Sequence, residues 1–276
     1  MGKVPPRSDI PRSDIPRSDK DGLFGPQSVT WKVNSDPAMV VGGMRALLVQ
    51  ALNPLAMAGV DQHSNFREDS WGRFERTSQF IMTSTFGTRA EAEALGARVR
   101  RIHDGVRGTD PVTGRAYWAG QPELLAWVHN VLAHSLVVAK QRYGGGLSRV
   151  DADRYLTEMV RMAELVGTPA ALVPTTMPDL RDYLRGEELV ASPLAQEAKW
   201  AVLTPPLPLR VRPVWAVLDT AAVGLLPARV RRLYRLPWFT PASPAVRLAA
   251  TVGFGALELL LPGPPERRRA EARLAA

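Results

Sequence analysis

Apolar residues recur along this chain at the three- and four-residue spacing of α-helices, and alternating strand patterns are nearly absent. One such run opens at Asp36-Pro37 and places Val40, Met44 and Leu47 on a single helical face. We therefore predict an all-α protein. The expected helices cover residues 36–53, 70–86, 88–103, 122–143, 148–166, 178–185, 193–202, 214–225, 227–234 and 244–261.

Capping and turn residues mark several of the expected helix ends. Thr88 and Glu91 form a capping-box pattern, in which each side chain can accept from a backbone N–H of the other residue. Pro122 opens the longest helix, and Gly144 follows its last turn. The Gly-rich stretch 105–121 is predicted to be a loop.

The chain is predicted to contain one folded domain between two tails. Near the N-terminus Pro-Arg-Ser-Asp recurs every five residues from Pro6, and proline at that spacing excludes helix and sheet. We expect residues 1–27 to be a disordered tail without catalytic function. The later breaks are too short for domain boundaries, so 28–262 is one helical domain and 263–276 a basic tail.

Composition removes several classes of site and partner. The chain has no cysteine, which excludes disulfides, thiolate metal sites and cysteine nucleophiles. It also lacks a phosphate-binding Gly-rich loop, a Gly-x-Ser-x-Gly motif and a His-Glu-x-x-His motif. No signal-peptide pattern and no run of about 18 apolar residues is found, so we expect a cytoplasmic protein.

The net charge is +8 and comes almost entirely from scattered arginines. Aromatic residues do not interleave with these arginines, so we expect no nucleic-acid partner. A solvated basic surface explains the pattern, and contact of the C-terminal basic helices with anionic membrane lipids is the alternative.

The chain has four histidines, and His129 lies within the most apolar helical run. Leu125, Val128 and Leu132 flank it on the same stripe. His134 lies five residues on, about 140° around the helix, so the two cannot share one metal ion. His129 is either a hydrogen-bonded core residue or a single ligand reaching into a cavity, and a haem needs only one such nitrogen.

A second candidate group precedes this helix. Arg73 and Thr77 are separated by four residues and lie on one helix face, beside the apolar Phe74 and Phe80. A guanidinium next to an apolar face needs an anionic partner, either a carboxylate of the protein or a cofactor propionate. His63 and His103 lie near helix ends between polar residues, and this position favours a structural hydrogen-bonding role over a ligand role.

Taken together, these segments resemble the family that contains the bacterial rubber oxygenases and the fungal mpaB-type oxygenases. The resemblance covers about residues 28 to 240. The matching motifs are Arg45-Ala-Leu-Leu-Val-Gln-Ala-Leu-Asn-Pro54, Ala58-Gly-Val-Asp-Gln-His-Ser64, Arg73-Phe-Glu-Arg-Thr77, Ile102-His-Asp-Gly-Val-Arg-Gly108, Trp127-Val-His129, Val166-Gly-Thr-Pro169 and Leu225-Leu-Pro227.

The resemblance implies a haem b oxygenase with its haem pocket inside the helical domain. By that likeness His129 is the axial ligand and the only metal ligand, and Arg73 and Thr77 are catalytic residues near the haem and dioxygen. His63, His103 and Arg76 are the further residues expected around the cofactor. The substrates implied are dioxygen and an apolar unsaturated or aromatic small molecule. Oxidative cleavage of a carbon–carbon double bond is the reaction best known in the family, and hydroxylation or dehydrogenation are the alternatives.

The sequence departs from the family pattern at two positions. Arg76 stands where rubber oxygenases can have a lysine that binds the iron, and a guanidinium has no free lone pair to give. Asn53 stands where a histidine is expected before the proline. Two other functions stay open: a non-catalytic helical protein that binds haem or lipid, and a non-haem iron oxygenase using His63, His103 and His129.

Overall fold

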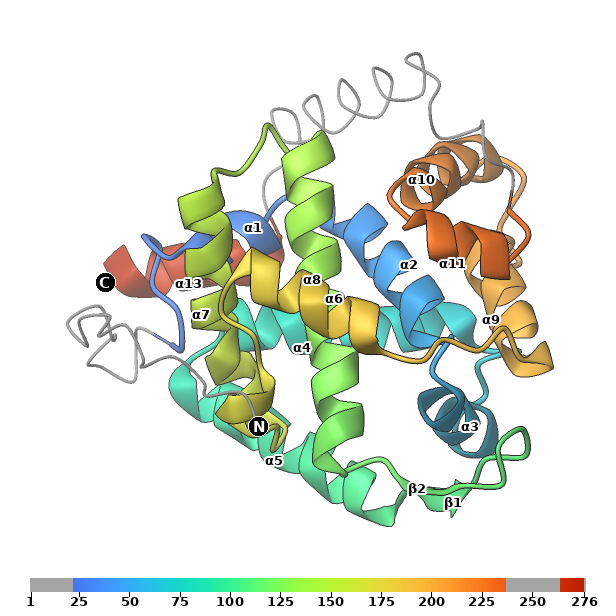
Figure 1. The fold of residues 1–276 in the computed structure, drawn as a ribbon. Helices are drawn as coiled ribbons and strands as arrows, with labels where there is room; N and C mark the ends of the chain where they lie inside the picture. The colour runs from blue at the N-terminus through green and yellow to red at the C-terminus, as the bar shows by residue number, and fades with distance from the viewer. Residues whose placement is uncertain (1–21, 237–263, 276) are drawn as a thin grey trace.

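The computed structural model describes residues 22–236 and 264–275, and this part of the chain is almost wholly helical, which confirms the all-α prediction (Figure 1). The elements in chain order are α1 (Val29–Asn34), α2 (Met39–Gln50), α3 (Pro54–His63), α4 (Ser70–Phe86), α5 (Arg89–Gly105), β1 (Arg107–Thr109), β2 (Ala116–Trp118), α6 (Pro122–Tyr143), α7 (Arg149–Leu165), the short 3-10 helix η3 (Ala170–Leu172), α8 (Met177–Gly186), α9 (Pro193–Leu203), α10 (Arg212–Gly224), α11 (Ala228–Leu233) and α13 (Pro265–Ala275).

Helix α6 runs through the centre of the molecule, with α2 beside it (Figure 1). It is apolar on nearly all sides, as expected of a helix that is surrounded by others. Trp127, Val131 and Leu136 are among its fully buried residues. Pro122 occupies its first turn and Gly144 caps its end, as the sequence predicts.

Helix α4 passes behind α6 and α2 in Figure 1, and α5 packs on α4 in the lower part of that view, while α7 and α8 pack on α6. The predicted capping box at the start of α5 is present, because Thr88 accepts from the Glu91 backbone and Glu91 accepts from that of Thr88. Helix α13 packs against α4, and Arg273 there donates to the Phe86 carbonyl oxygen at 2.9 Å.

Several elements differ from the sequence-based expectation: α1, α3, η3 and α13 lie outside the expected helix ranges, and α13 falls in the stretch expected to be a basic tail. Helix α3 was not expected, because Asn53-Pro54 was taken only as the end of the preceding helix. Asn53 in fact also caps α3, since its side chain accepts from the Ala56 N–H at 3.0 Å. The predicted loop 105–121 contains a short antiparallel hairpin, in which Gly108 pairs with Tyr117.

A buried ion pair links the end of α6 to the turn before α2. The Lys140 ammonium donates to the Asp36 carboxylate, and both side chains are buried. Asp36 also accepts from the Ala38 N–H at 2.8 Å. This pair fixes the two helices that form the centre of the molecule.

The C-terminal part of the chain carries two of the expected helices, α10 and α11, close to their predicted ranges. The expected helix 244–261 lies outside the described residues, as does most of the predicted N-terminal tail. None of the described helices could cross a membrane by itself; α2 and α3 pass the length and composition test only as a pair bent by 103°.

Candidate functional site

Helix α6 holds His129 in the interior, with 6% of its surface exposed. Its Nε2 atom is fully buried and has no hydrogen-bond partner in the described part of the chain. Burial lowers the pKa of His129 from 6.5 to about 4, so the ring is neutral near pH 7. A neutral imidazole with an unpaired buried nitrogen is unusual for a purely structural residue and suits a ligand.

A narrow apolar cavity of about 40 Å³ lies between α2, α4 and α6. Leu132 and Leu136 form its α6 wall, and they stand three and seven positions after His129, on nearly the same side of the helix. The remaining lining residues come from the other two helices and are Met39, Val40, Gly43, Ala46, Leu47, Gln50, Phe74, Thr77, Ser78 and Ile81. The face of α6 that carries His129 therefore also carries the two leucines that line this cavity.

Helix α4 supplies the only hydroxyl groups that line this cavity, those of Thr77 and Ser78. The Thr77 hydroxyl donates to the Arg73 carbonyl oxygen one turn earlier, at 3.0 Å, and the residue is exposed at the edge of the cavity. Phe74 reaches toward α2 at Gly43, where an added Cβ would lie 3.2 Å from its ring. The structure therefore places Thr77 on the wall that faces α6.

Arg73 lies one turn before Thr77 on α4 and links this helix to the C-terminal end of α3. Its Nη1 donates to the Ser64 hydroxyl at 3.1 Å, and no carboxylate of the described residues lies within ion-pair distance. Burial, and secondly the charge of Arg76, lowers the pKa of Arg73. Burial also lowers the pKa of His103, and the charge of Arg73 lowers it further. Asp104 acts on His103 in the opposite direction and raises its pKa, so the ring lies between a negative and a positive charge.

Two of the expected cofactor residues lie at the surface. Arg76 forms an ion pair with Asp69 at 3.0 Å, and its side chain is 64% exposed. His63 is exposed, and its Nε2 lies 3.1 Å from the Arg107 carbonyl oxygen of the hairpin. His103 differs, because its Nδ1 is buried and has no partner in the described structure.

The donor chemistry at His129 fits a haem better than a metal held by several side chains. Across residues 22–236 and 264–275, no three His, Asp or Glu side chains come together as a metal site. A haem iron needs one axial nitrogen and apolar surroundings, and His129 and the cavity wall have that character. Small-molecule sites usually enclose about 300–1,000 Å³, so the cavity fits a porphyrin only if its walls separate.

Of the three helices around this cavity, α4 has the fewest contacts with the other two. Helices α2 and α6 pack along each other, whereas the main packing partners of α4 are α1, α5 and α13. Side-chain hydrogen bonds also join α2 to α6: the Gln50 amide donates to the Val128 carbonyl oxygen at 2.8 Å, and the Trp127 indole donates to the Gln50 carbonyl oxygen at 3.3 Å. The α2 and α6 walls are therefore joined to each other, whereas the α4 wall packs mainly on helices outside the cavity.

Gln50 was missed by the sequence analysis. It lines the cavity and binds the backbone next to His129. The signal was present, because Gly43, Ala46, Leu47 and Gln50 follow helical spacing and Gln50 is the polar member of that stripe. A polar side chain in an apolar stripe indicates either a partner across the interface or a role at a site.

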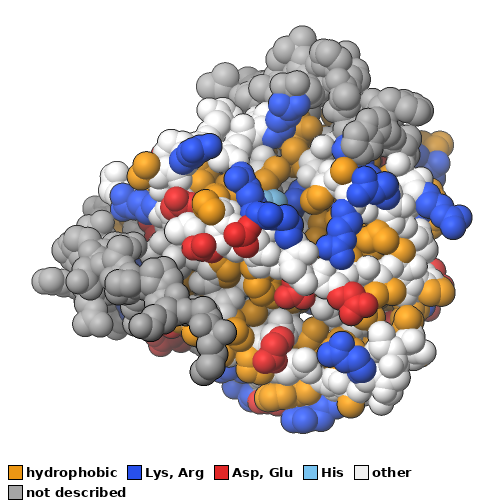
Figure 2. Space-filling model, viewed as in Figure 1, with side chains coloured by type: hydrophobic (Ala, Val, Ile, Leu, Met, Phe, Trp, Pro, Cys, Tyr) orange, Lys and Arg blue, Asp and Glu red, His pale blue; other side chains and the backbone are white. Residues whose placement is uncertain are grey.

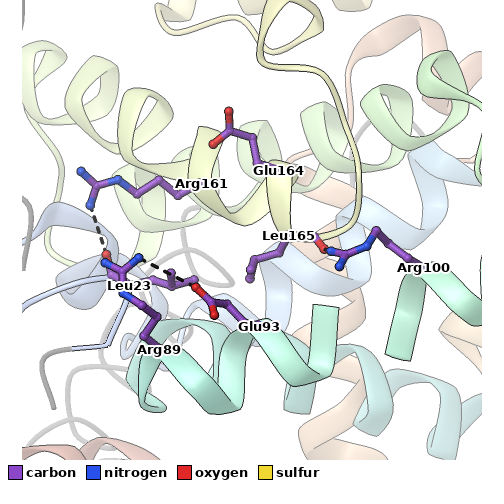
Figure 3. A pocket seen from close by; sticks show the side chains of 7 residues that line it. All are labelled: Leu23, Arg89, Glu93, Arg100, Arg161, Glu164 and Leu165. Carbon is purple, nitrogen blue, oxygen red and sulfur yellow. Dashed lines mark hydrogen bonds and ion pairs between the residues drawn. The ribbon is translucent and has the colours of Figure 1, made fainter. Parts of the chain in front are cut away.

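A larger cavity, of about 380 Å³, lies between α5 and α7 (Figure 3), and none of the predicted site residues lines it. Two of its arginines form hydrogen bonds with the backbone. Arg161 donates to the Leu23 carbonyl oxygen at 3.1 Å, and Arg100 donates to the Leu165 carbonyl oxygen. Figure 3 also shows Glu93 and Glu164 around it, so both charge signs are present. No histidine lines this cavity, and it offers no iron ligand.

Residues 31–256 match the family described as "ER-bound oxygenase mpaB/B'/Rubber oxygenase, catalytic domain". No curated protein matches the chain, and no solved structure does. The match spans most of the helical domain and includes α2, α4 and α6, which form the cavity beside His129. The chain therefore belongs to the mpaB and rubber oxygenase catalytic-domain family and is, by that membership, an oxygenase.

Proposed function

We propose that the protein is a haem-b-dependent oxygenase whose iron is held by His129. The observation that carries this proposal is the buried, neutral and unpartnered Nε2 of His129 in a chain of an oxygenase family. A histidine with that character loses hydrogen-bond energy in the core unless a ligand takes its lone pair. An iron porphyrin would supply dioxygen activation at this position.

We assign the other roles at this site to residues around the cavity. His129 keeps a free lone pair because burial disfavours its protonation. Leu132 and Leu136, with the apolar wall of α2, exclude water and favour an apolar substrate. Thr77 can direct its hydroxyl hydrogen into the cavity by leaving the Arg73 carbonyl oxygen. Arg73 holds a positive charge close to that wall without a carboxylate to neutralise it, and so favours an anionic group nearby.

The apolar lining supports an unsaturated or aromatic small molecule as substrate, with dioxygen as the second substrate. Oxidative cleavage of a carbon–carbon double bond is the reaction that we propose for it. The lining offers few polar groups to orient a substrate, so shape and the position of the double bond would decide which molecules react.

The absorption spectrum of the purified protein tests the cofactor assignment. We expect a Soret band and about one haem per chain. His129→Ala should abolish or greatly reduce the haem content, whereas His134→Ala, which removes another buried histidine of α6, should keep it. Full haem retention in His129→Ala would refute the ligand assignment. Iron without porphyrin would favour a non-haem oxygenase instead.

A second experiment tests the catalytic residues. Arg73→Ala should keep its haem but lose dioxygen uptake with a panel of unsaturated hydrocarbons, because the uncompensated charge near the cavity is lost. Arg76→Ala is the matched control, since Arg76 is exposed and paired with Asp69. Equal uptake by wild type and Arg73→Ala would remove Arg73 from the mechanism. Haem without any uptake would favour a non-catalytic haem-binding protein.

Haem binding should also widen the cavity at α4. Hydrogen–deuterium exchange of the haem-free and haem-loaded protein should differ in α4 more than in α2 or α6, because α2 and α6 are joined by side-chain hydrogen bonds. Equal change in all three helices would contradict the assignment of α4 as the wall that moves.

A further inference from the structure

Arg45 is a buried cation for which the described structure supplies no anion. Its side chain extends from α2 into the interior, and the residue is 2% exposed. Its Nε donates to the Leu225 carbonyl oxygen at 2.9 Å and its Nη1 to the Ser135 hydroxyl at 2.5 Å. Both acceptors are neutral, and no described carboxylate lies within ion-pair distance. Burial lowers the pKa of Arg45 to about 10, so it keeps its charge at neutral pH.

His134 directly precedes Ser135, the hydroxyl partner of Arg45 on α6, and it is also buried and incompletely paired. It is 9% exposed, and its Nδ1 is buried without a hydrogen-bond partner among the described residues. Burial, followed by the charges of Arg45 and Arg181, lowers the pKa of His134 to about 3. Two cations from different helices therefore act on this ring, and the ring itself is neutral.

Arg181 of α8 is the second cation that acts on His134, and it lies at the surface. It is exposed and forms no ion pair with the described residues, whereas Arg185 on the next turn is paired with Asp182. In Figure 2 a histidine lies between Lys and Arg side chains, in the region where α2, α6 and α8 adjoin in Figure 1. Contacts between α6 and both α2 and α8 agree with this arrangement.

A buried guanidinium costs several kcal/mol when no counterion accompanies it. Oxyanions bind to N–H donors, and both buried residues have such donors. Arg45 has five N–H groups, of which two are used, and the neutral His134 ring has one N–H to donate. Of Arg45, His134 and Arg181, only Arg181 is exposed, so an anion from solvent meets it first.

We propose that Arg45, His134 and Arg181 form an oxyanion-binding site that takes a carboxylate or phosphate group. This site is separate from His129, because His134 lies five residues farther along α6 and about 140° around it. It does not depend on the cofactor proposal, since none of its three residues lines the cavity between α2, α4 and α6.

Titration of the full-length protein with sodium phosphate and, separately, sodium acetate tests the site at constant ionic strength set with chloride. The readout is the NMR signal of the His134 ring, assigned by its loss in His134→Gln. We expect a saturable shift of this signal with at least one of the two anions. Arg181→Ala should weaken that binding at least about tenfold, as the loss of one charge-assisted hydrogen bond implies. Arg185→Ala should bind as tightly as wild type.

The two anions distinguish the natural ligand class. Saturation by phosphate alone would assign a phosphate-bearing ligand, and saturation by acetate alone a carboxylate ligand. Arg45→Lys, checked for folding by circular dichroism, should also bind more weakly, because it keeps the charge and loses the planar fork of donors. His129→Ala should bind the anion normally even if it loses haem. The proposal is overturned by the absence of a saturable shift with either anion, or by equal binding in wild type and Arg181→Ala.

Discussion

Replacement of His129 by leucine should remove a large part of the protein's sensitivity to acid. The pKa of His129 is about 4 in the folded protein and about 6.5 in an exposed histidine. The unfolded chain therefore binds a proton first as the pH falls, and folding stability is lost between about pH 6.5 and pH 4. Above pH 6.5 both states are neutral at this residue and its contribution is constant.

The size of the effect follows from the two pKa values. A shift of one unit corresponds to about 1.4 kcal/mol, so cofactor-free wild type should lose about 2–3 kcal/mol through this residue between about pH 7 and pH 4.5. His129→Leu keeps an apolar side chain of similar bulk and should lack this loss. Other acid-sensitive groups, including His134, act equally in both proteins and cancel in the difference.

Urea unfolding followed by circular dichroism at several pH values measures that difference. The free energy of unfolding of wild type minus that of His129→Leu should fall as the pH decreases through this range. His63→Gln is the control, because His63 lies at the surface, and it should follow wild type. A wild-type pH dependence that persists unchanged in His129→Leu would show that His129 is not held neutral by burial.

Two further predictions concern the fixed wall formed by α2 and α6. Lys140→Met should lower the free energy of unfolding by about 3–5 kcal/mol, since it leaves the Asp36 carboxylate buried without its partner, while Arg185→Ala, which breaks an exposed ion pair, should cost less than about 1 kcal/mol. Chemical denaturation measures both, and similar losses would contradict the role of burial. Gly42→Ala should destabilise by about 1–3 kcal/mol, because its Cβ would lie 2.9 Å from a leucine of α6, whereas Gly105→Ala meets nothing within 4 Å. Thermal unfolding should separate these two variants, and equal melting temperatures would argue against close α2–α6 packing.

Local signals in the sequence predicted most of the helices. The range 70–86 agrees with α4 and the range 122–143 with α6, because apolar spacing and terminal Pro or Gly residues act within one segment. The same local reading missed α3, since Asn53 ends one helix region and caps the next. It also missed the β1–β2 hairpin, whose strands are three residues each and carry too little alternation to detect.

The candidate site could be predicted only in part. The apolar stripe around His129 and the pairing of Arg73 with Thr77 on one face follow from helical geometry. The burial of His134 beside Arg45 does not, because it depends on how α2 meets α6, ninety residues apart. The surface position of Arg76 could not be predicted either. Helical geometry alone allows its side chain to point inward, whereas in the structure it pairs with Asp69 at the surface.

The packing of α13 on α4 has a consequence for the order in which the site is made. The helix that bears Thr77 is braced by residues that a ribosome adds about 190 positions later, or roughly 10–40 s at usual rates of synthesis. The α2–α6 wall, in contrast, has all its residues once α6 has emerged. During synthesis the protein would thus hold His129 in a completed α2–α6 wall while α4 has its contacts with α1 and α5 but not yet those with α13, and α4 is least supported in this interval.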